Sequence, residues 1–184
     1  MLYRDLKQAN LQWMFTNFHL GVHQPLSWLS WAIDYRIWGM NPFGYHLTNL
    51  LLHCTNAVLL YFLSLRLFLL ARPLDMRPGT WDLDRRHGFF THDACLMSYV
   101  SLYAALAFSL HPLRVSSVVW ASNRSYPLAG FFFLATILTY LRAVDHKGKR
   151  YAAWMSVSLL SFACSLLSKA IGMSLPLVLL LLDL

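Results

Sequence analysis

The chain has 184 residues, of which 58% are hydrophobic and 12% are charged, and its formal net charge is +7. Soluble domains carry about 25% charged residues, and a chain of this length cannot bury so many apolar side chains in one core. The composition therefore excludes a disordered chain and argues against an ordinary soluble domain. The remaining class is a membrane protein.

The excess of positive charge has two interpretations. A basic chain can bind nucleic acid, but Lys and Arg also collect in the cytoplasmic loops of membrane proteins. The second interpretation suits an apolar chain better, so we expect membrane lipids and no nucleic acid among the partners.

Residues 1–44 contain no run long enough to cross a bilayer, but they are rich in aromatic side chains. Trp28, Trp31, Tyr35 and Trp38 recur at spacings of 3, 4 and 3, which is one face of a helix. Because Trp and Tyr prefer the membrane–water interface, residues 25–38 are predicted to form an amphipathic helix lying on the outer leaflet. A helix packed on the bundle is the equal alternative. Residues 1–44 are thus expected to be an outer-face segment with an interfacial helix.

Residues 45–184 are expected to form a transmembrane bundle. A crossing needs about 20 mostly apolar residues, and five uncharged runs qualify as candidates. The predicted fold class is all-α, a polytopic integral membrane helical bundle of about five transmembrane helices plus the interfacial helix. The chain ends inside the fifth run, so we expect this bundle to be truncated at its ends. The five runs are residues 45–65, 96–110, 125–141, 151–168 and 170–182.

Positive charge is distributed unevenly among the connections between these runs. Segments 66–93 and 142–150 hold nine cations, whereas segment 111–124 and the last connection together hold three. The first two segments are therefore expected in the cytoplasm, and the N-terminal segment and segment 111–124 outside or in the lumen. The expected localisation is a multi-pass membrane protein of the bacterial inner membrane or the endoplasmic reticulum.

Four polar residues form a stripe on the first predicted crossing: His46, Asn49, His53 and Asn56, at spacings of 3, 4 and 3. They must face other helices or a wet cavity, because unpaired polar groups in hydrocarbon cost several kcal/mol. Hydrogen bonding between helices is one interpretation, and His46, nearest the outer mouth, is the functional candidate. No carboxylate shares the stripe, so no metal site is predicted.

Three cations on the low-charge side are candidate substrate-binding residues: Arg114, Arg124 and Lys169. Each borders an apolar run, and the forked donors of Arg suit phosphate. Binding of a lipid-linked phosphate is one interpretation, and snorkelling to the interface is the other. His46 and His111 would add hydrogen bonds to the same oxygens.

Several sequence blocks, taken together, resemble a known family. They resemble the membrane half of the tetratricopeptide-containing transmembrane O-mannosyltransferases and their bacterial relatives, which are GT-C class glycosyltransferases. The resemblance runs from about residue 10 to residue 184. The blocks are Gln24-Pro-Leu-Ser-Trp-Leu-Ser, Trp38-Gly-Met-Asn-Pro-Phe-Gly-Tyr-His-Leu-Thr-Asn-Leu-Leu-Leu-His53, His111-Pro-Leu-Arg-Val, Leu167-Ser-Lys-Ala and Leu175-Pro-Leu-Val-Leu-Leu-Leu-Leu-Asp183.

This resemblance implies a transferase that takes a mannose-like sugar from a polyprenyl- or dolichyl-phosphate donor. The acceptor is a protein or glycan on the outer or lumenal face, and a tetratricopeptide domain follows the membrane part. The family also has an acidic motif in the first outer loop, which acts as general base or holds a divalent metal in the complete enzyme. That motif would precede Met1, so we expect this chain alone to be inactive and to hold no cofactor. Asp34 is then the remaining candidate catalytic residue.

Two departures from the family pattern leave a second function open. Relatives usually carry Glu at the position of Ser116, and they usually read Ser-Glu-Arg-Lys-Asp where this chain reads Ser122-Asn123-Arg124-Ser125-Tyr126. The loss of these carboxylates favours a non-catalytic relative that binds lipid phosphate or a partner protein. Arg114, Arg124 and Lys169 match the family and fit an anionic donor.

The predicted orientation can be measured directly. A reporter fused within residues 77–86 should lie in the cytoplasm, because the segment around it carries five of the cations. A reporter found on the outer side would overturn the topology.

Overall fold

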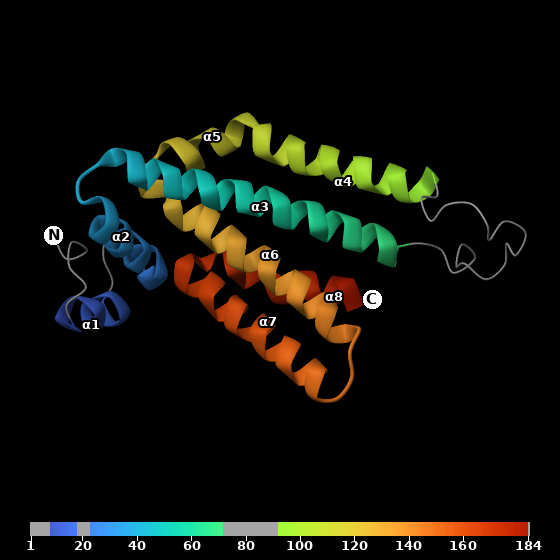
Figure 1. Ribbon diagram of the computed structural model, residues 1–184. Coiled ribbons are helices and arrows are strands. Elements are labelled where there is room, and N and C mark those ends of the chain that lie inside the picture. The colour runs from blue at the N-terminus through green and yellow to red at the C-terminus, as the bar shows by residue number, and fades with distance from the viewer. Residues whose placement is uncertain (1–7, 18–22, 72–91, 184) are drawn as a thin grey trace, which may run out of the picture.

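The structure is a computed structural model that describes residues 8–17, 23–71 and 92–183. Every regular element in these ranges is a helix, which confirms the all-α prediction (Figure 1). Longer helices are joined by two short 3₁₀ helices, η3 and η4. The elements are α1 (Gln8–Thr16), α2 (Pro25–Trp38), α3 (Pro42–Leu70), α4 (His92–Leu110), α5 (Pro112–Val119), η3 (Ala121–Arg124), α6 (Ser125–Val144), α7 (Lys149–Ser168), η4 (Ala170–Ser174) and α8 (Leu175–Asp183).

The long helix α3 lies at the middle of the arrangement. It packs against α4 on one side and α6 on the other, and α7 runs back along α6 (Figure 1). A buried apolar cluster of Leu63, Ile137, Leu141 and Leu175 joins α3, α6 and α8. The helices α1 and α2 lie at the end of the bundle where α3 begins.

Three helical segments are long and apolar enough to cross a membrane: Pro42–Leu70, Ala121–Val144 and Lys149–Ser168. A fourth arises if Cys95–Leu110 and Pro112–Val119, bent by 59°, form one span. The predicted fifth run is divided, because the 3₁₀ turn of η4 uses five residues before α8 begins. The described residues thus support three or four spans, and the expected number of five is not confirmed.

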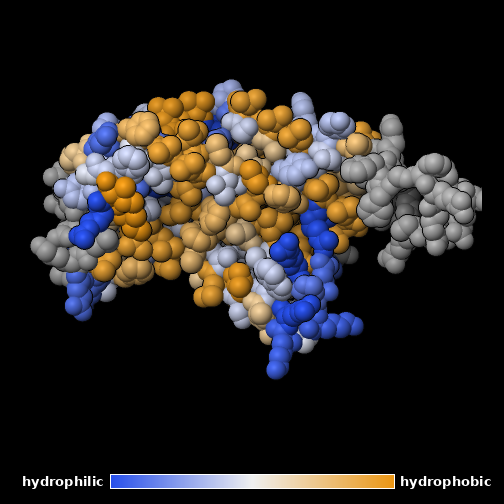
Figure 2. Space-filling model, viewed as in Figure 1, coloured by the Kyte–Doolittle hydropathy of each residue, from blue (hydrophilic) through white to orange (hydrophobic). Residues whose placement is uncertain are grey.

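The outer surface agrees with a membrane environment. Figure 2 shows apolar side chains over much of the visible face and hydrophilic ones gathered near the turn between α6 and α7. Large apolar side chains such as Leu106, Leu159 and Leu160 are exposed. A water-soluble protein rarely exposes such continuous apolar surface.

The helix bounds follow local capping signals. α2 has the predicted bounds, whereas α3 begins at Pro42, earlier than predicted. Pro at the first position suits a helix start, and the Phe43 N–H donates to Asn41 Oδ1 at 3.1 Å. Residues 39–41 form the short connection between α2 and α3, and Gly39 adopts a φ of 59° there.

Segment 111–124 is mostly helical, although it was expected to be a loop. α4 ends as predicted at Leu110, and His111 caps α5 because its Nδ1 accepts the Leu113 N–H at 3.2 Å. The other expected loop, residues 66–93, lies mainly outside the described residues.

The helix α2 packs on the bundle, against α3 and α7. Ser27 is fully buried, and its Oγ donates to the Ser168 carbonyl at 3.1 Å. This contact favours the packed alternative for α2, while its place relative to the outer leaflet stays a prediction.

A close contact between α2 and α3 requires glycine at position 44. A Cβ atom added to Gly44 would lie 2.1 Å from Cγ of Trp38. Gly44 therefore allows the Trp38 ring to pack directly on the first turn of α3.

We expect Gly44→Ala to lower the free energy of unfolding by about 1–3 kcal/mol, because the Trp38 ring must move. Reversible unfolding in mixed detergent micelles measures this change. The matched control is Gly130→Ala, where the added Cβ would lie 3.4 Å from Asn56 Nδ2 and should cost little. Equal stability of the two variants would contradict the packing argument.

Candidate functional site

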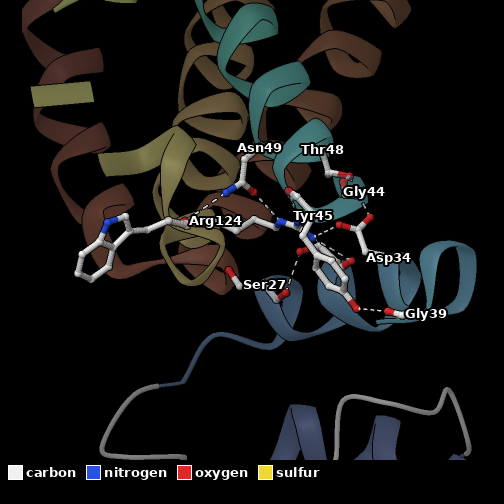
Figure 3. Close-up of polar contacts among 10 residues, drawn as sticks. Ser27, Asp34, Gly39, Gly44, Tyr45, Thr48, Asn49 and Arg124 are labelled. Atoms are coloured by element: carbon white, nitrogen blue, oxygen red, sulfur yellow. Dashed lines mark hydrogen bonds and ion pairs between the residues drawn. The ribbon is translucent and has the colours of Figure 1, made fainter. Parts of the chain in front are cut away.

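The most buried charged group of the described chain is Arg124, which has 0% exposure. Its Nη1 lies 2.5 Å from Asp34 Oδ2. Nε donates to Asn49 Oδ1 at 2.8 Å, and Nη2 donates to the Tyr45 carbonyl at 2.9 Å (Figure 3). The Ser30 carbonyl accepts from Nη1 at 3.3 Å. Arg124 thus joins α2, α3 and η3 through contacts that use its whole guanidinium group.

Asp34 is enclosed in the same way. It is 5% exposed, and it accepts a hydrogen bond from Thr48 Oγ1 at 3.0 Å as well as pairing with Arg124. An acceptor hydroxyl does not reach a carboxylate in this position. The internal contacts of Arg124 and Asp34 thus occupy the groups that were expected to bind phosphate and to act as a catalytic acid or base.

Three members of the polar stripe on α3 bond to distant backbone carbonyls. Asn49 Nδ2 donates to the Trp120 carbonyl at 3.2 Å, and Asn56 Nδ2 donates to the Pro127 carbonyl at 2.8 Å. Nε2 of His53 lies 3.1 Å from the Ser109 carbonyl. Hydrogen bonding between helices thus accounts for these three residues. His46, the predicted functional member, is exposed on the first turns of α3 and lines none of the cavities around the site.

A cavity of about 280 Å³ lies between α3, α5, α6 and η4. Asn56 lines this cavity and is 3% exposed, and its buried Oδ1 has no hydrogen-bond partner among the described residues. The cavity combines polar groups with apolar walls, as ligand sites commonly do. Its polar lining comprises His53, Asn56, Arg114, Ser117, Tyr126 and Ser174, and its apolar lining includes Leu60, Phe108, Phe133, Leu134 and Ile171.

Arg114 stands between this cavity and a second one. The second cavity, of about 530 Å³, is lined by Arg114, His111 and Phe108 among others. The Arg114 Cζ lies 4.5 Å from the Phe108 ring centroid, and the His53 ring stacks on the same Phe108 at 5.7 Å. Arg114 itself is exposed, so its N–H donors are accessible from both cavities.

Lys169 adjoins the first cavity through an aromatic contact. Its Nζ lies 3.2 Å from the ring centroid of Tyr126, which lines the cavity. The structure thus brings Arg114 and His111 to a common cavity and places Lys169 beside the neighbouring one. Phe108 and Tyr126, which hold the two cations, were missed because aromatic residues are frequent throughout this sequence.

Neither of the two cavities has a carboxylate among its described lining residues. Within residues 8–17, 23–71 and 92–183, no group of three or more His, Cys, Asp or Glu side chains is placed to hold a metal ion. Such a site is suited to binding an anion, and its described residues do not fit a divalent metal.

Comparison with known proteins finds relatives among curated sequences. Protein O-mannosyl-transferase TMTC2 of Homo sapiens is 30% identical over 161 residues, which cover 85% of this chain and 16% of that protein. Protein O-mannosyl-transferase tmtc2 of Xenopus laevis is 29% identical over 161 residues, which again cover 85% of this chain and 16% of that protein. Protein O-mannosyl-transferase TMTC4 of Homo sapiens is 28% identical over 163 residues, or 83% of this chain and 19% of that protein. The chain thus spans about a sixth of the length of the TMTC2 relatives that it matches. No family model and no solved structure matches.

The buried ion pair gives a stability prediction. We expect Arg124→Gln to lower the free energy of unfolding by about 3–5 kcal/mol, because Asp34 then stays buried without its partner charge. The exposed Arg114→Gln is the control and should change it by no more than about 0.5 kcal/mol. Reversible unfolding in mixed micelles measures both. An Arg124→Gln protein as stable as the control would show that the pair does not hold α2 to the bundle.

Proposed function

The chain is homologous to one segment of the TMTC family of protein O-mannosyl-transferases, and from this premise we propose that it forms part of the membrane region of a GT-C glycosyltransferase. The donor is a polyprenyl- or dolichyl-phosphate-linked, mannose-like sugar. The acceptor is a protein or glycan on the outer or lumenal face. The relatives are eukaryotic proteins, which supports the endoplasmic reticulum as the location of this multi-pass chain.

The position of Arg114 is the observation that supports a donor site. Among the three cations predicted to bind phosphate, Arg114 is exposed and lies on an aromatic ring. The guanidinium group of Arg124, in contrast, is buried and bonded to other parts of the chain. A cation held by a ring retains its charge and its N–H donors for an anionic ligand. The proposed phosphate position is therefore beside Arg114, whose side chain lines both cavities.

The surrounding residues fit a lipid-linked phosphate. Lys169 adds a second positive charge beside Tyr126, and His111 adds a ring in the cavity that it shares with Arg114. The apolar walls of the smaller cavity, which include Leu60 and Phe133, suit the first isoprene units. Arg124 and Asp34 act indirectly by holding α2, α3 and η3 in place.

A second candidate function rests on the acid-free lining of the two cavities. General acid–base catalysis requires a group that takes the acceptor proton, and the described lining residues of these cavities include no carboxylate. A non-catalytic relative would bind the lipid phosphate, or a partner protein, without transferring sugar. Both functions share the phosphate site, and sugar transfer by the purified protein separates them.

The phosphate site itself can be tested with polyprenyl phosphate. We expect Arg114→Ala to weaken its binding to the purified protein by roughly 1.5–3 kcal/mol, the usual range for a hydrogen bond to a charged group. Lys169→Ala should weaken binding in the same direction. Equilibrium binding in detergent measures both variants.

The matched control is Arg36→Ala, which removes an exposed cation of α2 that lines neither cavity. Its binding should equal that of the parent. If Arg114→Ala and Lys169→Ala also bind like the parent, these two cations are interfacial anchors and the site is misplaced.

A further inference from the structure

A separate cavity of about 470 Å³ lies at the opposite end of the bundle, where α3, α6 and α7 meet. It is lined by the charged side chains of Arg66, Arg142 and Asp145, together with Thr139 and Trp154. Its apolar lining comprises Phe62, Leu65, Leu69 and Leu138. None of these residues takes part in the site proposed above.

The charges of this cavity do not cancel. Arg66 forms an ion pair with Asp145, which leaves Arg142 as the excess cation. The Arg142 Cζ lies 5.3 Å from the Trp154 ring centroid. Among the described residues, this ring is the partner of the Arg142 guanidinium group. Arg142 is exposed, so its N–H donors are available to a ligand.

The surroundings add more positive charge. Lys147 lies in the turn between α6 and α7, Lys149 and Arg150 begin α7, and all three are exposed. Figure 2 shows hydrophilic side chains gathered at this turn, directly beside the apolar surface of the helices. A ligand of this cavity should therefore be anionic at one end and apolar at the other.

We propose that this cavity binds the headgroup of an anionic phospholipid. The phosphate lies against Arg142 and the free donors of Arg66, and the acyl chains follow the exposed side chains of Phe62 and Leu69 on α3. Basic pockets between membrane helices bind anionic headgroups in this way. Trp154 fits the same depth, because its ring prefers the level of the headgroups.

A lipid explains the cavity better than a free phosphate. The guanidinium groups alone would bind either anion, but much of the lining is apolar and opens beside helices that are long and apolar enough to span a membrane. A soluble phosphate leaves this apolar surface unused. An acyl chain removes it from water, and each buried CH₂ group contributes about 0.8 kcal/mol.

The test is native mass spectrometry of the purified chain in detergent with equal amounts of phosphatidylserine and phosphatidylcholine. Phosphatidylserine should be retained preferentially, and Arg142→Gln should weaken its binding about fivefold, as expected for one basic group near an anionic lipid. The Arg142→Lys variant should bind phosphatidylserine more weakly than the parent chain and more tightly than Arg142→Gln, because Lys keeps the charge and lacks the planar fork of donors. Glycerol 3-phosphate should not displace the lipid at concentrations where phosphatidylserine saturates the site.

The matched control is Arg150→Gln, which removes the same charge from the same end of the bundle without changing the lining of the cavity. The affinity of this variant for phosphatidylserine should stay within about twofold of that of the parent chain, as expected for a charge that does not contact the headgroup. Equal losses for Arg142→Gln and Arg150→Gln would show diffuse attraction and overturn the pocket. Equal retention of both lipids, or displacement by glycerol 3-phosphate, would overturn the assignment of an anionic phospholipid.

Discussion

The ion pair between Asp34 and Arg124 determines how the N-terminal half of the bundle is arranged. A buried charge is tolerated only when its partner charge and its remaining donors are satisfied, and here Asn49 and two backbone carbonyls complete the guanidinium contacts. Because Arg124 directly precedes α6, its fixed position also fixes the start of that helix. Tyr126, two residues later, lines the cavity of about 280 Å³, and its ring contacts the Lys169 ammonium group. One enclosed pair thus connects α2 to the proposed donor site.

The three cations on the low-charge side look alike in the sequence, and their neighbours separate them. A carboxylate within reach makes Arg124 an internal support, whereas aromatic rings hold Arg114 and Lys169 without neutralising them. A ring contributes attraction but takes no proton and forms no competing ion pair. Cations in such a setting remain able to bind an anion. At the other end of the bundle Arg66 is paired with Asp145 and Arg142 lies on the Trp154 ring, so the excess positive charge there belongs to Arg142.

Local features of the sequence predicted local features of the fold. The spacing of Trp and Tyr predicted the bounds of α2, and the uncharged runs predicted the C-terminal ends of α4 and α7, because these features depend on neighbours in the chain. The partners of the polar stripe were not predictable, since Asn49 and Asn56 bond to carbonyls of Trp120 and Pro127, which any residue supplies. The helix α5 was missed because serines and a proline suit a loop equally well. The shortened fifth run depends on a 3₁₀ turn that apolar composition does not reveal.

Two of the positions that depart from the family pattern, Ser116 and Asn123, are neighbours in space. Asn123 Nδ2 donates to the Ser116 carbonyl at 3.4 Å, which joins η3 to α5. Members of the family that this chain resembles usually carry Glu at both positions, and two carboxylates so close would repel each other unless a cation or a shared proton lay between them. Neutral residues at both positions leave the segment from α5 to η3 without a carboxylate beside Arg114, and Ser125 also stands where the family usually carries Lys.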